Sequence, residues 1–157
     1  MTVVESPFAK VRRKMVTARV EFMSQLAKFS KDELTQEPAP GEWSPLRLAH
    51  HLYIADGLVL EQMRRVQSED NPLLANFEEE SPYLTRTSEP PVSLDAVLAG
   101  MAARREELFE YLSSLPAEAW ERPCRHHQWG QLKFYQLANI LYVHDQQHTQ
   151  QLAAIKG

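Results

Sequence analysis

The chain has 157 residues, of which 43% are hydrophobic, so we expect one domain with a sizeable core over residues 1–157. Its 17 Lys and Arg against 21 Asp and Glu give a net charge of −4, which lacks the basic footprint of a nucleic-acid-binding protein. One cysteine, Cys124, excludes an intramolecular disulfide framework and a Cys-rich zinc finger. No apolar run approaches the ~18 residues that a membrane span needs, and the first residues contain no secretory h-region. We therefore expect a cytoplasmic protein without nucleic-acid or membrane partners.

The positions of the prolines predict where the helices lie. A proline inside a helix removes a hydrogen bond and clashes with the preceding turn, and the ten prolines leave four long windows rich in good helix formers. Ser6-Pro7 and Ser44-Pro45 place a capping serine before a proline at the first helical position, and Ser93 can cap a third helix. Because alternating β-branched segments are missing, we expect no strands. The sequence predicts four helices, at 7–30, 45–67, 93–114 and 131–155.

Helices of this length suit an all-α fold, an antiparallel four-helix bundle. Two of the connections are long. Residues 68–92 have an acidic bias, and residues 115–130 contain two tryptophans, which is too aromatic for a disordered linker. Gly57 and Gly100 interrupt two of the predicted helices, and we attribute them to close helix–helix approach.

Three histidines fall where the apolar stripes of two helices would place leucine. In the last helix the stripe passes through positions 144 and 148, so His144 and His148 face the expected interior. Residues at i and i+4 lie on one helix face, so both imidazoles can point at one spot. The stripe of the 45–67 helix places His51 in the same way.

Two neutral imidazoles at this spacing, with a third from another helix, suit a divalent metal such as zinc, nickel or iron. The alternative is that these residues are hydrogen-bonded core histidines. Periodicity alone does not decide between His51 and His50, which lies one step off the stripe. His126 and His127 belong to the second long connection, and we interpret them as surface or site-rim residues rather than ligands.

Other candidate residues carry weaker signals. Asp145 stands between the paired histidines in HDQQH, which resembles the zincin HExxH pattern with a shorter carboxylate. It could act as a general base, orient a ligand or lie outside the site. Cys124 could be a nucleophile or soft ligand, but no neighbouring base marks it, which favours an ordinary loop thiol. The basic pair Arg104-Arg105 is interpreted as a solvated helix face.

Two segments resemble the DinB-like (DinB/YfiT) metalloprotein superfamily. GEWSPLRLAHHL, residues 41–52, is similar to the W-S-P-x-x-x-x-x-H-L signature, and HDQQHTQQL, residues 144–152, is similar to the closing H-x-x-x-H segment. The resemblance covers nearly the whole chain and implies a four-helix bundle, often dimeric, with an open three-histidine metal site. It places the metal ligands on His51, His144 and His148, and so selects His51 over His50.

The resemblance also implies an activity, because some members of the superfamily are transferases or isomerases that use bacillithiol, mycothiol or glutathione. Three histidines leave a coordination position open, and a divalent ion lowers the pKa of water or of a thiol. The leading hypothesis is a metal-dependent enzyme that uses a low-molecular-weight thiol; water in its place would give a metal-dependent hydrolase. The alternatives are a non-catalytic bundle that stores, senses or structurally uses a metal, and a metal-free interaction module.

Overall fold

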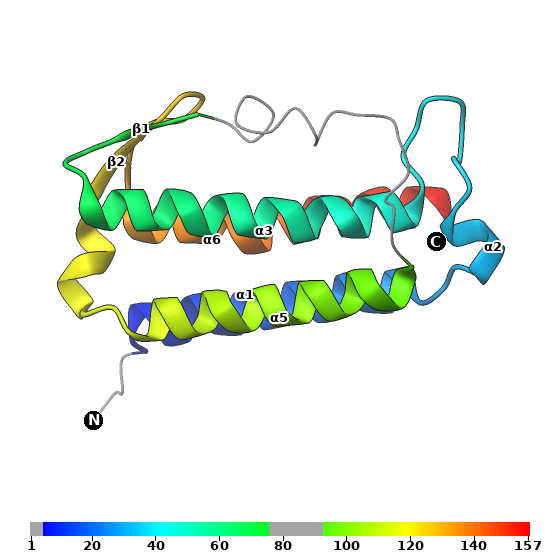
Figure 1. The fold of residues 1–157 in the computed structure, drawn as a ribbon, viewed down its shortest axis with the longest axis horizontal. Helices are drawn as coiled ribbons and strands as arrows, with labels where there is room; N and C mark the ends of the chain where they lie inside the picture. The colour runs from blue at the N-terminus through cyan, green and yellow to red at the C-terminus, as the bar shows by residue number, and fades with distance from the viewer. Residues whose placement is uncertain (1–4, 76–92) are drawn as a thin grey trace.

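A computed structural model describes residues 5–75 and 93–157 of the chain. Four long helices form its frame, namely α1 (Pro7–Leu26), α3 (Pro45–Ser68), α5 (Leu94–Ser113) and α6 (Phe134–Ile155). In Figure 1 their axes are aligned, with α1 and α5 in one layer and α3 and α6 in the other. The predicted all-α four-helix bundle is confirmed as the fold class.

The directions of the helices bring α3 and α6 together as antiparallel neighbours. α1 packs chiefly on α6, and α3 packs chiefly on α5. The members of each of these pairs run in the same direction, and the two pairs run in opposite directions (Figure 1). Among the described residues, α5 begins at the same end of the bundle as α3. α3 and α6 also contact one another, and they carry the three predicted site histidines.

Serine caps start three of the helices, as the sequence predicts. Ser6, Ser44 and Ser93 each accept a hydrogen bond from the backbone N–H three residues later, at 3.1, 3.2 and 3.2 Å. The prediction of a first helix over 7–30 is too long, because α1 ends at Leu26. The chain then starts the short helix α2 (Lys31–Leu34), whose N-terminus is closed by a capping box between Ser30 and Glu33.

A small sheet at one end of the bundle corrects the expectation that strands are absent. β1 (Leu73–Leu74) pairs in parallel with β2 (Pro123–His126), which pairs antiparallel with β3 (Gly130–Lys133). A short 3₁₀ helix, η2 (Ala117–Glu121), precedes β2. β3 occupies the first residues of the predicted 131–155 helix, so α6 begins only at Phe134. Strands this short have almost no local pattern, and pairing with distant residues stabilises them.

The bundle has two apolar core clusters, one toward each end. Met15, Leu108 and Leu137 belong to the cluster next to the sheet, and Phe22 and Leu52 belong to the cluster at the other end. Charged side chains lie between the two clusters, and one of them is Arg105, which is only 6% exposed. The prediction that Arg104-Arg105 forms a solvated face is therefore wrong for Arg105.

Gly57 and Gly100, which we attribute from the sequence to close helix–helix approach, face large side chains at the contact between α3 and α5. A Cβ atom on Gly57 would collide with the Arg104 guanidinium, and one on Gly100 would lie 3.0 Å from the Tyr53 ring. Both glycines therefore make room for a large side chain at the contact between α3 and α5.

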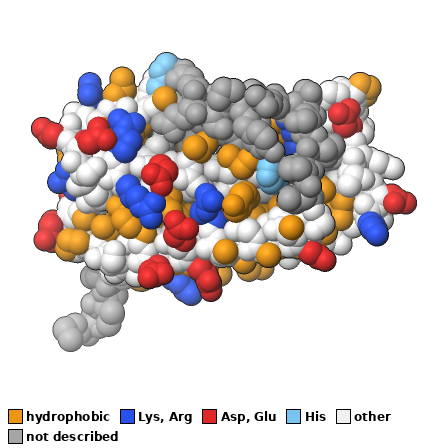
Figure 2. Space-filling model, in the orientation of Figure 1, with side chains coloured by type: hydrophobic (Ala, Val, Ile, Leu, Met, Phe, Trp, Pro, Cys, Tyr) orange, Lys and Arg blue, Asp and Glu red, His pale blue; other side chains and the backbone are white. Residues whose placement is uncertain are grey.

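The exposed face of α3 and α5 carries both signs of charge. Figure 2 shows Lys and Arg interspersed with Asp and Glu on this face, with hydrophobic side chains between them. No helix in the described ranges is long and apolar enough to cross a membrane. Most of the predicted 68–92 connection, including its acidic residues Glu78, Glu79 and Glu80, lies outside the described residues.

Candidate metal centre

Three imidazoles from two helices meet between α3 and α6. Nε2 of His51 lies 3.0 Å from Nε2 of His144, and Nε2 of His148 lies 3.0 Å from the same atom. One ring nitrogen from each of the three residues lies within 4.8 Å of the other two. The antiparallel contact of α3 and α6 thus brings together residues that are 93 positions apart in the sequence. Their ligation of a metal remains a prediction.

Burial keeps these imidazoles neutral. It lowers the pKa of His51 to about 3, with the neighbouring His144 and His148 as further causes. Burial also lowers the pKa of His144 to about 3, helped by His148 and by the positive charge of Arg19. The pKa of His148 is lowered too, again chiefly by burial. Neutral imidazoles carry the lone pairs that metal ligation requires.

Neighbouring side chains orient two of the three rings. Nδ1 of His148 lies 2.8 Å from Oε1 of Gln151, so the Nδ1–H donates to this oxygen and leaves the lone pair on Nε2. The ring of Trp43 stands edge-on to the His51 ring, with centroids 5.1 Å apart. The guanidinium of Arg47 in turn covers the Trp43 ring at 4.4 Å. The W-S-P segment of the predicted motif thereby supports the histidine that follows it.

The three histidines border an open cavity of about 1020 Å³, which we call the metal-site cavity. It is lined by Pro38, Gly41, Glu42, Trp43, Leu48, His51, His144, Gln147, His148, Gln151, Ala154 and Ile155. Glu42 is the one carboxylate among these described lining residues, and Gln147 and Gln151 contribute amides. The cavity therefore offers a small molecule both room and hydrogen-bonding groups beside the imidazoles.

The remaining predicted histidines lie outside the cluster. His50 stacks on Tyr53, with ring centroids 6.1 Å apart, and does not join the three imidazoles. His126 is not an exposed loop residue, because it lies in β2 and is only 5% exposed. His127 follows β2 and is likewise outside the cluster. The expectation that neither His126 nor His127 belongs to the ligand set agrees with this placement.

Cys124 is a strand residue rather than a loop thiol. It lies in β2, is fully buried in the core cluster next to the sheet, and pairs with Leu132 of β3. Burial raises the pKa of its thiol, which disfavours the reactive thiolate. The structure thus gives Cys124 a packing role and places it outside the three-histidine cluster.

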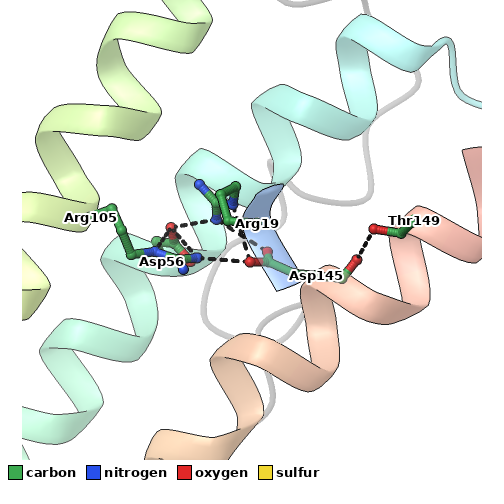
Figure 3. A network of polar contacts seen from close by, with 5 residues as sticks. All are labelled: Arg19, Asp56, Arg105, Asp145 and Thr149. Carbon is green, nitrogen blue, oxygen red and sulfur yellow. Dashed lines mark hydrogen bonds and ion pairs between the residues drawn. The ribbon is translucent and has the colours of Figure 1, made fainter. Parts of the chain in front are cut away.

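Asp145 belongs to a buried network of ion pairs (Figure 3) and is not one of the three clustered ligand groups. Its carboxylate receives hydrogen bonds from Arg19 of α1 and Arg105 of α5, at 3.1 and 3.2 Å. Both guanidinium groups also bind Asp56 of α3, at 3.0 and 3.2 Å. One charged residue from each long helix therefore meets in the middle of the bundle.

Sequence reasoning missed Arg19 and Asp56 and placed Arg105 on the surface. The available signal was a carboxylate, Asp56, next to the apolar stripe of α3 at Ala55. Such a charge in the interior requires an opposite charge on another helix, but the sequence does not say which one. The structure assigns Asp145 to this network, which leaves the general-base interpretation without support.

The donor set fits a divalent metal. Two Nε2 atoms 3.0 Å apart form a hydrogen bond only if one of them carries the proton. Nε2 of His144 makes two such contacts but can hold only one proton. Nδ1 of the buried His51 finds no hydrogen-bond partner in the described part of the chain. A cation at the place toward which the three lone pairs converge would satisfy all three Nε2 atoms together.

The sequence identifies the family. The sequence profile of the DinB superfamily matches residues 14–152, so the chain belongs to this superfamily. The uncharacterized protein YuaE of Bacillus subtilis (strain 168) is 24% identical over 151 residues, which cover 88% of this chain and 93% of that protein.

Two solved structures share the fold. YfiT from Bacillus subtilis, described as a probable metal-dependent hydrolase with an unusual four-helix bundle topology, superposes with a TM-score of 0.73 at 13% identity, over 98% of this chain and 89% of YfiT. The four-helix bundle protein TT2238 superposes with a TM-score of 0.67 at 18% identity, over 94% of this chain and 98% of TT2238. These likenesses agree with the fold class predicted from the sequence.

Proposed function

We propose that this protein is a metal-dependent enzyme that transfers a low-molecular-weight thiol to an electrophilic substrate. The observation that carries the proposal is the convergence of three neutral imidazoles within 4.8 Å at the border of an open cavity. His51, His144 and His148 would hold zinc, nickel or iron as the divalent ion. When bound, such an ion would lower the pKa of a thiol or of water and so supply a nucleophile near neutral pH.

The residues around the site prepare it for this chemistry. Gln151 keeps the lone pair of His148 directed at the other imidazoles through its 2.8 Å hydrogen bond. Trp43 packs edge-on against one side of the His51 ring. Gln147 and Glu42 present an amide and a carboxylate to the cavity, which can bind the amide and amino groups of a cellular thiol. A volume of about 1020 Å³ far exceeds the needs of a water molecule.

Hydrolysis is the second candidate activity. The observation that favours it is the whole-chain likeness to YfiT, which is itself described as a probable metal-dependent hydrolase. In that case water would take the place of the thiol at the same three-histidine site.

The test begins with protein purified without a His tag, stripped with chelator and reloaded with zinc or nickel. We expect about one metal ion per chain, and loss of this ion in the His51→Ala, His144→Ala and His148→Ala variants. His50→Ala is the matched control, because it removes the neighbouring imidazole and should keep the metal. A wild-type protein without stoichiometric uptake, or retention by His51→Ala with loss by His50→Ala, would overturn the site.

The activity assay then separates the two candidates. Loaded protein is incubated with glutathione, bacillithiol or mycothiol and a generic electrophile, and separately with an activated ester in the absence of thiol. Metal-dependent thiol conjugation that His148→Ala abolishes supports the transferase. Ester cleavage without conjugation selects the hydrolase, and equal background rates in wild type and variant reject both activities.

A further inference from the structure

A second cavity of about 440 Å³ adjoins the three-histidine site. We call it the apolar cavity, and its described lining consists of His126, Gln128, Trp129, Leu132, Gln136, Asn139, Ile140, Val143, His144 and Gln147. His144 and Gln147 also line the metal-site cavity. The two cavities therefore meet at one of the predicted metal ligands.

The spacing of the lining residues shows how the cavities are arranged. The lining residues that α6 contributes to the apolar cavity lie between Gln136 and Gln147. They are spaced alternately three residues and one residue apart, so they share one face of the helix. The metal-site cavity continues along nearly the same face, from His144 to Ile155. The cavities thus lie end to end along α6, with His144 where they join.

The lining of the apolar cavity is uncharged. None of its described residues is Asp, Glu, Lys or Arg. Its large side chains are Trp129, Leu132, Ile140 and Val143, and its polar groups are mainly amides. Trp129 is 51% exposed and Val143 is 39% exposed, although both are large hydrophobic residues. Such a surface favours a neutral, apolar ligand over an ionic one.

The aromatic wall of this cavity is held in place before any ligand arrives. The rings of His126 and Trp129 are stacked, with centroids 4.1 Å apart and an interplanar angle of 16°. Nδ1 of His126 accepts hydrogen bonds from the backbone N–H groups of Gln128 and Trp129, at 3.0 and 3.4 Å. The turn between β2 and β3 thereby fixes a flat indole beside α6, which suits an aromatic group that stacks on it.

We propose that the apolar cavity binds the uncharged aromatic group of the electrophilic substrate and presents its reacting carbon at His144. This inference rests on the proposed function and adds the substrate class. With an aryl chloride, the thiol sulfur forms a bond to the ring carbon and the carbon–chlorine bond breaks. Chloride leaves with the bonding electron pair, and the thiol proton passes to the solvent.

The binding experiment does not depend on turnover. Dinitrobenzene, which has no leaving group, is titrated into metal-stripped protein and followed by ligand-observed NMR and by quenching of Trp fluorescence. We expect saturable binding to wild type, and binding at least about tenfold weaker in Val143→Trp, which fills the cavity, and in Trp129→Ala, which removes its wall. Val20→Trp is the matched control, because it makes the same change at an exposed valine of α1 that lines neither cavity.

The kinetic experiment uses metal-loaded protein with chlorodinitrobenzene and with the small electrophile iodoacetamide. In Val143→Trp we expect kcat/KM to fall about tenfold more for chlorodinitrobenzene than for iodoacetamide, while both values stay at the wild-type level in Val20→Trp. If wild type and Val143→Trp bind dinitrobenzene equally well, or if wild type does not bind it, the assignment of the cavity is wrong. This holds whether or not the protein catalyses thiol conjugation. If Val143→Trp weakens dinitrobenzene binding but the loaded protein shows no metal-dependent thiol conjugation, the aromatic binding site is supported. The proposed transferase activity is then rejected.

Discussion

The three histidines differ in how the chain supports them. His148 donates its Nδ1–H to Gln151 one turn further along α6, which fixes both its tautomer and its ring plane. His51 is held by packing against Trp43, and its Nδ1 has no hydrogen-bond partner among the described residues. One hydrogen-bonded support of the site therefore lies on α6, at Gln151, which the H-x-x-x-H motif does not mark.

Replacement of Gln151 tests this support at the level of one residue. We expect Gln151→Ala to weaken metal binding about tenfold, because the loss of an outer hydrogen bond lowers ligand basicity and frees the ring. The dissociation constant is measured by competition with a chelator, and the stoichiometry should stay the same. Gln150→Ala, a neighbouring exposed position of the same helix, is the control. Equal affinities in the two variants would assign Gln151 no part in the site.

At the level of the elements, a buried network of ion pairs connects the four long helices. Arg19, Asp56, Arg105 and Asp145 come from α1, α3, α5 and α6, and their formal charges add to zero (Figure 3). The network lies between the two apolar clusters. Because it joins the four helices at one level of the bundle, we expect it to limit how far each helix can slide past its neighbours.

Removal of one carboxylate tests this network. We expect Asp145→Ala to lower the free energy of unfolding by about 3–5 kcal/mol, because it leaves two buried guanidinium groups with a single carboxylate. Glu61→Ala, which breaks an exposed pair with Arg64, is the control and should cost less than about 1 kcal/mol. Urea unfolding of both variants measures the difference.

The same variant decides the role of Asp145. Folded Asp145→Ala should still bind one metal ion per chain, since the carboxylate binds Arg19 and Arg105 and is not part of the three-histidine cluster. If Asp145→Ala instead loses little stability but loses catalytic turnover, Asp145 takes part in the reaction.

For the molecule as a whole, the buried imidazoles link stability to pH. In the metal-free folded protein the pKa values of His51 and His144 are about 3, whereas an unfolded chain has histidine pKa values of about 6.5. Below about pH 6.5 the unfolded chain takes up protons that the folded chain does not. The contribution of the neutral His51 and His144 imidazoles to the free energy of unfolding is therefore complete above about pH 6.5. It is lost as the pH falls toward 3.

Urea unfolding in the presence of chelator, between about pH 5 and pH 8, measures this dependence. We expect the free energy of unfolding to fall steadily below about pH 6.5 in wild type, and to fall less steeply in a His51→Gln, His144→Gln double variant. If the free energy of unfolding falls with pH equally steeply in the two proteins, burial does not lower the pKa of these histidines.

The sequence by itself determined the features that depend on neighbouring residues. Serine followed by proline fixed the starts of α1 and α3, because a cap needs only the next turn of backbone. The four-residue spacing of His144 and His148 fixed their shared face, because helical periodicity is local. The sequence motif shared with the superfamily selected His51 over His50, and the structure brings His51 to the other two imidazoles.

Only the tertiary structure decided the features that join distant segments. β1 lies about fifty residues before its partner β2, so the sheet and the burial of His126 have no local signal. The partners of Asp56 and Asp145 come from other helices, and no periodicity says which guanidinium meets which carboxylate. The apolar cavity forms where the β2–β3 turn meets α6, and the turn's place is fixed by strand pairing and by packing of Cys124 and Trp120 in the core. Such contacts depend on long-range chain closure and on shape, which residue patterns do not encode one segment at a time.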